Sequence, residues 1–260
     1  IKEKVIEVRN LSAAFNGRQV LQGVSFDAFV GEVTVILGVS GCGKTTVLKH
    51  ILGLHPIQSG FISVLGKDIS TISEEEQIEL YLQMGVFYQD GALLNSLTVG
   101  ENVALPLEQR TKLPSALIED IVRMKLGLVK LNDAFDLYPS ELSGGMLKRA
   151  ALARAIVMDP PLLCCDEPGS GLDPISLESL DNLIINLKRL LGISILVITH
   201  DVSSILRVAD RIIYIDDGVV VFEGSIKEAL NAKVDSVQNF FSVFKHENAR
   251  EFGRQFDHTE

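Results

Sequence analysis

The sequence predicts an α/β fold with a mixed, largely parallel sheet at its core, an N-terminal antiparallel β layer and a helical subdomain. Three patterns indicate this fold. Short continuous apolar runs recur along the chain, as is typical of strands covered on both faces. Helix-like stretches lie between these runs, which is the order expected of parallel strands joined by helices. The opening third instead shows two β-rich stretches that are separated by a tight turn.

The tight turn is Asn16-Gly17, between β-rich stretches at residues 5–11 and 19–26. Asn-Gly is a strong hairpin signal because both residues tolerate a positive φ. We therefore expect an antiparallel β layer that packs beside the main sheet.

Apolar runs predict the strands of the main sheet. These runs are Val33–Leu37, Leu162–Cys165, Ile195–Thr199 and Ile212–Ile215. The helix-like stretches lie at residues 44–53, 146–158 and 175–191. Their alternation with the apolar runs is typical of an α/β domain.

Residues 114–133 carry apolar positions at helical spacing and few strand signals. This pattern predicts a helical subdomain at about residues 90–158. We expect one domain over residues 4–231, followed by a C-terminal helical extension at residues 232–260.

The extension carries phenylalanines on an imperfect helical stripe with charged residues between them. They are Phe240, Phe241, Phe244, Phe252 and Phe256. The stripe fits either a helix folded back on the domain's own core or a contact with another subunit.

The composition favours a folded globule without a membrane span. Apolar residues make up 47% of the 260 residues and the net charge is −10, which argues against nucleic acid as a partner. The N-terminus lacks an apolar signal core, and no apolar run approaches the roughly 18 residues of a membrane-spanning helix. Any membrane role is therefore expected to be peripheral.

The cysteines, Cys42, Cys164 and Cys165, show no metal-like spacing. Neighbouring residues of a strand point to opposite faces, so Cys164 and Cys165 are expected to be buried small apolar side chains. A reducing compartment fits this usage best.

Residues 38–45 read Gly-Val-Ser-Gly-Cys-Gly-Lys-Thr and stand between a predicted strand and a predicted helix. In this context glycines let backbone N–H groups converge on phosphates, and the helix N-terminus adds a favourable dipole. Lys44 would reach the β- and γ-phosphates, and the Thr45 hydroxyl would bind Mg²⁺. The alternative is a chance glycine-rich turn.

The predicted strand at residues 162–165 ends in two carboxylates, Asp166 and Glu167. Strand alternation sends them in different directions, so they can do different jobs. Asp166 suits the Mg²⁺ shell, and Glu167 suits a water molecule beyond the γ-phosphate. Taken alone, such a pair is usually a strand meeting solvent.

A second glycine turn, residues 143–146, stands directly before a strong helix-forming stretch. Ser143 is placed to cap this helix, whose N-terminus could bind an anion. The turn could complete a phosphate site in another copy of the chain, because phosphoryl transfer needs positive potential from the far side. An ordinary capped helix is the equally weighted alternative.

The motifs occur in a fixed order: Gly38–Thr45, Gln89, Leu142–Met146, Asp166–Pro168, Ser170–Asp173 and His200. In this order they resemble the nucleotide-binding subunits of ABC transporters over about residues 4–231. The resemblance implies a P-loop NTPase fold and an ATPase. It further implies that two copies bind head to tail around two ATP molecules, each pocket combining one chain's phosphate loop with the other chain's second glycine turn.

The resemblance also implies which residues bind ATP. In one chain they are Phe15, Gly38, Val39, Ser40, Gly41, Cys42, Gly43, Lys44, Thr45 and Thr46; in the other chain they are Ser143, Gly144, Gly145 and Met146. Phe15 would stack on adenine, although a core strand aromatic is the alternative. Most of the family has glutamine where this chain has Met146, and methionine cannot replace its side-chain hydrogen bond.

Catalytic roles follow from the same resemblance. Glu167 would be the general base or water-positioning group, and His200 would contact the γ-phosphate. Mg²⁺ would be held by Thr45, Gln89 and Asp166, with Gln89 also contacting the attacking water.

Asp173 would couple the two sites of the dimer. Each of these last residues has a plain alternative: a polar strand end for Gln89, a structural histidine for His200 and a simple helix start for Asp173.

Leu142–Met146, followed by a basic pair and an alanine-rich helix, resembles the ATPases of Mla/Mce-type lipid transport systems. The resemblance implies phospholipid or another lipid as cargo, an integral permease whose coupling helix meets residues near 90–105, and a position on the cytoplasmic face of the inner membrane. A STAS-domain regulator and an MCE-domain lipid-binding protein are further implied partners. The C-terminal extension could grip the neighbouring ATPase.

Other functions share part of this pattern. An ABC ATPase for lipoprotein release, cell division or amino-acid import has the same chemistry and a different cargo. A non-transport ABC protein usually carries fused cassettes, long coiled coils or basic patches, and none is visible in this sequence.

Overall fold

The chain opens with an antiparallel hairpin in the computed structural model, which describes residues 2–248. The hairpin consists of β1 (Lys4–Phe15) and β2 (Arg18–Phe29), joined by Asn16 and Gly17 with φ of 51° and 76°. Together with β4 (Ser59–Val64) and β5 (Lys67–Asp68) it forms a sheet in the order β2-β1-β4-β5. The predicted antiparallel layer is confirmed.

The second sheet has the strand order β10-β9-β3-β8-β7-β6. Its strands are β3 (Val33–Leu37), β6 (Met84–Phe87), β7 (Leu162–Asp166), β8 (Ser194–Ile198), β9 (Arg211–Asp216) and β10 (Val219–Ser225). All neighbours pair in parallel except β10, which runs antiparallel to β9 at the edge. The largely parallel core is therefore confirmed as well.

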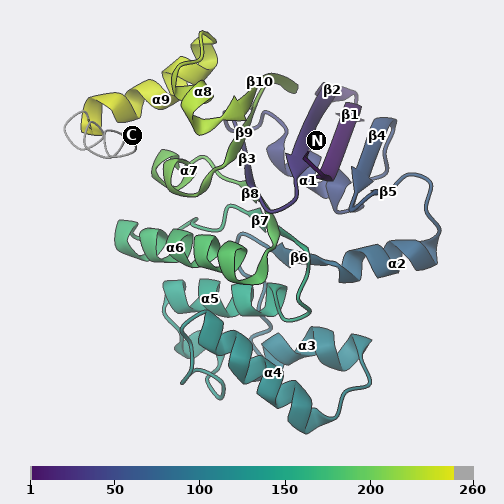
Figure 1. The fold of residues 1–260 in the computed structure, drawn as a ribbon, viewed down its shortest axis with the longest axis vertical. Helices are drawn as coiled ribbons and strands as arrows, with labels where there is room; N and C mark the ends of the chain where they lie inside the picture. Colours follow the sequence, from purple (N-terminus) through teal and green to yellow (C-terminus); the bar gives the residue numbers. More distant parts are fainter. Residues whose placement is uncertain (1, 249–260) are drawn as a thin grey trace.

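Helices connect and cover this sheet (Figure 1). They are α1 (Lys44–Ile51), α2 (Glu74–Leu82), α6 (Pro174–Leu191), α7 (Val202–Val208) and α8 (Ile226–Leu230). The apolar side chains of the sheet divide between two core clusters, one on each face. Cys164 belongs to one cluster and Cys165 to the other, so the two thiols point to opposite faces as predicted.

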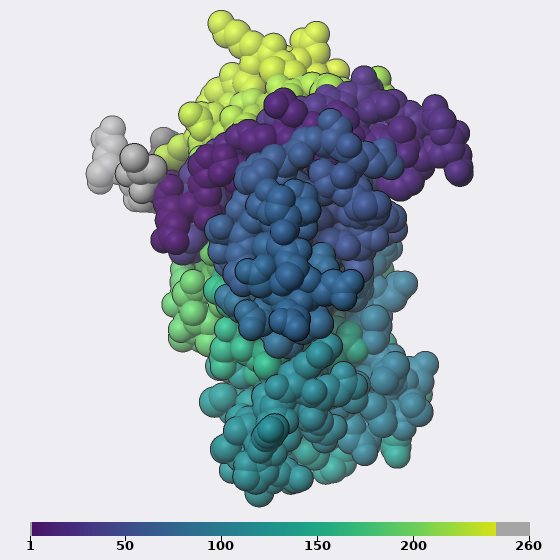
Figure 2. Space-filling view, turned by 90° about the vertical axis from the view of Figure 1, so that its right-hand side faces the viewer, coloured from purple at the N-terminus to yellow at the C-terminus, as the bar shows by residue number. Residues whose placement is uncertain are grey.

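A helical subdomain is inserted between β6 and β7. It consists of α3 (Val99–Arg110), α4 (Ser115–Leu128), a short 3₁₀ turn (Pro139–Glu141) and α5 (Gly144–Ala155). Figures 1 and 2 show these helices, in teal, at the end of the molecule opposite the purple N-terminal hairpin. The predicted helical subdomain is confirmed.

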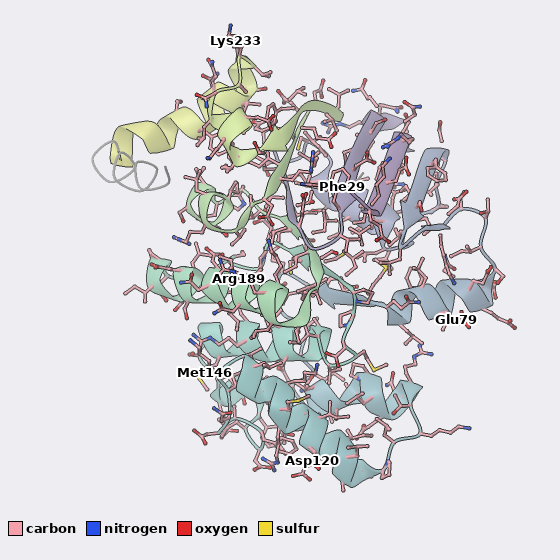
Figure 3. All side chains as sticks on the ribbon, in the orientation of Figure 1. Phe29, Glu79, Asp120, Met146, Arg189 and Lys233 are labelled. Carbon is pink, nitrogen blue, oxygen red and sulfur yellow. The ribbon has the colours of Figure 1, made fainter. Side chains whose placement is uncertain are left out.

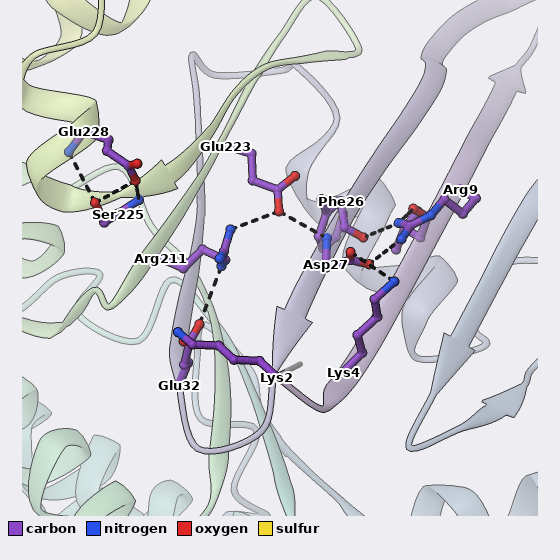
Figure 4. A network of polar contacts seen from close by, with 11 residues as sticks. Lys2, Lys4, Arg9, Phe26, Asp27, Glu32, Arg211, Glu223, Ser225 and Glu228 are labelled. Atoms are coloured by element: carbon purple, nitrogen blue, oxygen red, sulfur yellow. Dashed lines mark hydrogen bonds and ion pairs between the residues drawn. The ribbon is translucent and has the colours of Figure 1, made fainter.

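A polar network ties the hairpin to the second sheet (Figure 4). Arg211 pairs with Glu32 at 3.5 Å and with Glu223 at 3.1 Å, and Glu223 also accepts the backbone N–H of Asp27 at 3.5 Å. Asp27 in turn pairs with Arg9 at 2.7 Å. Partly exposed ion pairs contribute at most about 1 kcal/mol each, so they chiefly orient the two sheets.

The last described helix, α9 (Asp235–Asn248), begins on the core of its own chain. Val237 and Phe241 are buried, and the Phe240 ring meets the Tyr214 ring edge-on with centroids 5.6 Å apart. The start of the C-terminal phenylalanine stripe therefore packs on the core, while Phe252 and Phe256 lie outside the described residues. None of the helices in the described part of the chain is long and apolar enough to cross a membrane.

Candidate nucleotide-binding site

The phosphate loop, residues 38–46, connects β3 to α1 and is shaped by its glycines. Gly38 and Gly43 have φ of 150° and 106°, a region that other residues rarely adopt. A Cβ on Gly38 would lie 2.0 Å from the carbonyl oxygen of Ile215, and one on Gly43 would lie 2.5 Å from Leu21 Cδ2. The fold of this chain alone therefore requires glycine at both positions.

Lys44 places a positive charge inside the loop. Its side chain is buried, and Nζ donates to the carbonyl oxygens of Gly38 at 2.9 Å and Val39 at 3.0 Å. No carboxylate of the described residues forms an ion pair with Lys44. A buried cation without an acidic partner favours an anion beside it.

A pocket of about 330 Å³ opens over this loop. Its lining residues are Val20, Ser40, Gly41, Gly43, Lys44, Thr45, Thr46, Gln89, Glu167, Ser170 and His200. The structure thus brings together residues from the phosphate loop, the end of β6, the end of β7 and the end of β8. These segments meet because the carboxyl ends of parallel strands share one edge of the sheet.

Glu167 and His200 form a pair within the pocket. His200 Nδ1 donates to Glu167 Oε1 at 2.9 Å. Glu167 follows β7 with a φ of 46°, so its side chain leaves the direction of the strand. A carboxylate held by an imidazole at the lining of this pocket is placed to orient a water molecule.

Asp166 is the last residue of β7, and it is not among the residues that line the pocket. Its Oδ1 is buried without a hydrogen-bond partner. Burial raises the pKa of this carboxyl, and the neighbouring charge of Glu167 raises it further, while Lys49 and Lys44 lower it. A buried, unpartnered carboxylate oxygen fits a divalent cation.

Thr45 and Gln89 supply the other oxygens that a cation could use at the lining of this pocket. In the described part of the chain, no group of three or more His, Cys, Asp or Glu side chains could hold a metal ion.

Phe15 lies at the end of β1 and does not line the pocket. Its ring is 36% exposed and packs against His55, with ring centroids 5.1 Å apart. The role of Phe15 in stacking on adenine stays a prediction.

The second glycine turn does not line the pocket either. Ser143 caps α5, because its Oγ accepts the N–H of Met146 at 3.3 Å. Met146 is partly buried and packs against the main core cluster. Figure 3 shows Met146 in the half of the molecule that carries α3–α5, away from α1.

Gly144 and Gly145 have no structural reason within this chain to be glycine. Neither has a positive φ. A Cβ on Gly144 would come no closer than 3.9 Å to Leu172, and one on Gly145 no closer than 3.7 Å to Ser176, which are ordinary contacts. Glycine disfavours a helix by up to about 1 kcal/mol relative to alanine, so the second glycine turn keeps its surface clear at some cost.

Asp173 lies outside the pocket and caps α6. Its Oδ1 accepts the N–H groups of Ile175 and Ser176 at 3.0 Å each. Hydrogen bonds from Ser176 and Ile175 lower the pKa of the carboxyl. The alternative of a simple helix start thus describes its local structure, and a role in coupling two sites stays a prediction.

Two lining residues, Val20 and Ser170, were not among the predicted site residues. Val20 belongs to β2, and only the close approach of Gly43 to Val20 and Leu21 shows why it borders the phosphate loop. Ser170 begins the motif Ser170–Asp173, and its Oγ accepts a hydrogen bond from Gln89 Nε2 at 3.3 Å. The place of Ser170 in this motif was the available signal.

Cys42 is buried beneath the phosphate loop, outside the pocket lining. Its Sγ lies 3.9 Å from Lys44 Nζ, and burial raises the pKa of its thiol. Val39 instead points outward, with 53% of its surface exposed. Of the predicted loop residues, Gly38, Val39 and Cys42 shape the loop from outside the cavity.

Comparisons with known proteins agree with this geometry. The family described as ABC transporter matches residues 21–170. The intermembrane phospholipid transport system ATP-binding protein MlaF of Haemophilus influenzae is 41% identical over 233 residues, which cover 90% of this chain and 88% of that protein. The probable ribonucleotide transport ATP-binding protein mkl of Mycobacterium leprae is 42% identical over 206 residues, which cover 79% of this chain and 59% of that protein.

Solved structures are similar over most of the chain. CbiO1 from Clostridium perfringens, part of an ABC transporter complex, matches with a TM-score of 0.84 at 29% identity and covers 97% of both chains. MJ0796, an ATP-binding cassette solved as a dimer with ADP and Pi, matches with a TM-score of 0.77 at 28% identity and covers 85% of this chain and 98% of that one.

Proposed function

This chain belongs to the ABC transporter family, and we propose that it is the ATP-hydrolysing subunit of a transporter whose cargo is phospholipid. ATP binding and hydrolysis, and dimerisation, are shared with the family and with the dimeric cassette MJ0796. The observation that carries the mechanism is the pair of glycines at the start of α5, which the chain itself does not need.

The second glycine turn completes the pocket of a second copy. Gly144 and Gly145 keep the N-terminus of α5 clear, Ser143 is exposed beside them, and all three lie outside their own chain's pocket. An uncovered helix N-terminus attracts phosphate through its free N–H groups. A head-to-tail dimer of the kind the family forms would set this surface against the γ-phosphate held by the partner's phosphate loop.

Within each pocket the residues divide the work of hydrolysis. Lys44 neutralises charge on the β- and γ-phosphates. In this structure its ammonium donates to carbonyl oxygens of the phosphate loop. Glu167 orients and deprotonates the attacking water, and His200 holds Glu167 and contacts the γ-phosphate. Phe15 offers its exposed face to adenine.

Thr45, Gln89 and Asp166 would hold Mg²⁺, which would supply positive charge to the bound phosphates. The orphaned Oδ1 of Asp166 is the strongest support, because a bound cation would satisfy it. Asp166 must be ionised for this role, so its raised pKa makes cation binding weaken as the pH falls toward that pKa.

The transporter's membrane permease would dock beside the helical subdomain. A pocket of about 300 Å³ lies between α2, β6, α3 and α5, and Tyr81, Tyr88, Pro106 and Met158 contribute to its wall. Tyr88, which lines this pocket, is 42% exposed. Leu94, in the segment near residues 90–105, is 49% exposed. Exposed apolar side chains around a groove fit an inserted helix of a partner.

Phospholipid is the cargo that the comparisons favour. The match to MlaF covers nearly the whole of both chains, whereas the match to mkl covers only 59% of that protein. An Mla-like system would place this chain on the cytoplasmic face of the inner membrane, with a STAS-domain regulator and an MCE-domain lipid-binding protein as further partners. The C-terminal extension would in addition contact the neighbouring ATPase; residues 249–260 of this extension lie outside the described part of the chain.

Mixed dimers test the two-chain pocket. Lys44→Ala and Ser143→Arg variants, each also carrying Glu167→Gln so that bound ATP is not hydrolysed, are given different affinity tags and co-expressed with the permease. Complexes with both tags are isolated. Each such dimer has one intact pocket. Random pairing makes about half of all dimers mixed, so about a quarter of all pockets are restored before the mixed dimers are isolated. We expect about one tightly retained ATP per mixed dimer and none in either parent. Assembled mixed dimers that retain no ATP would contradict the proposal.

The cargo is tested on the purified complex with its permease. We expect phospholipid to co-purify in near-stoichiometric amount, as measured by mass spectrometry of the extract, and fluorescent phospholipid to move between vesicles only with ATP. Complexes carrying Glu167→Gln serve as the control for ATP dependence. ATP-driven uptake of a ribonucleotide, without lipid movement, would instead favour the mkl-like cargo.

A further inference from the structure

The backbone that carries Gln89 is held by cations from α5. This segment, residues 89–92, is called the glutamine loop below. Lys148 donates to the carbonyl oxygen of Gln89. Arg154 donates to the carbonyl oxygens of Gly91 and Ala92, each at 2.7 Å. Helix α5 therefore holds the glutamine loop through hydrogen bonds to three of its carbonyl oxygens.

Close packing reinforces this grip. Gly91 is buried with a φ of 72°, and a Cβ on it would lie 3.1 Å from the Cβ of Ala151, which stands between the two cations on α5. The loop backbone thus lies directly on the helix.

Lys148 and Arg154 depend on the glutamine loop for hydrogen bonds that satisfy their charges. Lys148 is 8% exposed, and neither Lys148 nor Arg154 forms an ion pair with a carboxylate in the described part of the chain. Burial lowers the pKa of both side chains. The negative charge of Asp90 partly offsets this for Lys148, whose ammonium also lies 5.7 Å from the centre of the Phe87 ring. A buried cation is costly unless hydrogen-bonded, so displacing the loop from α5 would leave both charges unsatisfied.

Helix α5 therefore has two functional ends. Its N-terminus is the second glycine turn, and its middle and C-terminal turns hold the glutamine loop. Gln89 points from that loop into the chain's own pocket, where its Nε2 donates to Ser170 Oγ at 3.3 Å. From Gly144 to Arg154 the helix spans about 15 Å at 1.5 Å per residue.

We propose that Lys148 and Arg154 are positioning residues that fix Gln89 to α5. The inference rests on the proposed function, because in the proposed dimer the two ends of α5 belong to different pockets. The second glycine turn closes the partner's pocket, while Gln89 serves its own. When the turn engages the partner's ATP, the helix carries the glutamine loop with it, and the state of one pocket sets the position of Gln89 in the other.

Replacement of Lys148 by methionine tests this coupling. Methionine fills similar space but cannot donate to the Gln89 carbonyl. We expect the kcat for ATP hydrolysis by the full-length chain to fall by about 10-fold, while the affinity for a fluorescent ATP analogue changes by less than about 2-fold. Lys148→Arg, which keeps a donor, should restore most of kcat.

Lys125 provides the matched control. It is a second buried lysine of the same subdomain, on α4, and it pairs with Asp159 without touching the glutamine loop. Lys125→Met should lower thermal stability as much as Lys148→Met or more, with kcat per folded molecule unchanged. Equal losses of kcat in the two variants would overturn the inference, because they would reflect general damage to the subdomain.

A double-mutant cycle shows whether Lys148 acts through Gln89. We expect Gln89→Ala to lower kcat, and Lys148→Met to add no further loss in the Gln89→Ala background. An undiminished effect of Lys148→Met in that background, or a Gln89→Ala variant with normal kcat, would overturn the inference. The mixed-dimer experiment does not involve Gln89, so the two-chain pocket stands or falls separately.

Arg154→Lys is a second variant in case Lys148→Met does not fold. Lysine keeps the charge but cannot bridge two carbonyls with one planar group. Its kcat should fall in the same direction by a smaller factor, again with nucleotide affinity preserved. A normal kcat for Arg154→Lys would overturn the inference.

Discussion

Replacing Glu167 by glutamine is expected to lower ATP turnover by at least about 100-fold while ATP binding persists. Glutamine keeps the size of the side chain and can still meet His200, but it cannot accept the proton of the attacking water. Because the unhydrolysed nucleotide keeps both pockets closed, the ATP-bound dimer should accumulate. Phosphate release and size-exclusion chromatography with ATP and Mg²⁺ measure the two effects.

Glu223→Gln is the control for this experiment. Glu223 accepts from Arg211 at 3.1 Å on the seam between the two sheets, away from the pocket. Its replacement removes one carboxylate of the same kind without touching the site, so turnover should stay near that of the unmodified chain. Undiminished hydrolysis by Glu167→Gln would remove Glu167 from its proposed role.

Replacing Gly145 by alanine is expected to change stability and activity in opposite directions. Within one chain the new Cβ meets only ordinary contacts with Ser176, and alanine favours a helix over glycine. The free energy of unfolding should therefore rise by about 0.4–1 kcal/mol. In the dimer the same methyl group would stand where the partner's γ-phosphate approaches, so turnover should fall by at least about 10-fold.

Thermal or urea unfolding of the single chain and steady-state ATPase assays measure the two effects. Gly127→Ala on α4 is the control, since a Cβ there meets only the exposed side chain of Asn132, at 3.1 Å. That variant should leave turnover unchanged. If Gly145→Ala destabilises the chain, or is fully active, the glycine does not serve a second copy.

The strands β3, β7, β8 and β9 of the main sheet could be predicted closely because each is a continuous apolar run. The prediction for β3 has the observed bounds, and the prediction for β7 stops one residue short. β5 was not predicted, because two residues carry no periodic signal. α2 was missed although Ser73 and Glu76 form a capping box that the sequence displays.

The candidate site could be predicted where a motif lies at the end of a strand. The phosphate loop, Gln89, Glu167 and His200 meet in one pocket because they follow neighbouring parallel strands. Val20 could not be predicted, since its place depends on how the hairpin packs over the loop. The grip of Lys148 on the glutamine loop depends likewise on packing between segments 59 residues apart.

The separation of the second glycine turn from the chain's own pocket has a kinetic consequence. In the proposed two-chain pocket a lone chain supplies only half of each active centre, so the hydrolysis rate of dilute protein should grow with the square of its concentration until pairing saturates. A permease that tethers two copies replaces this encounter with a local concentration in the millimolar range. Free subunits would then consume little ATP, and binding to the membrane partner would switch hydrolysis on.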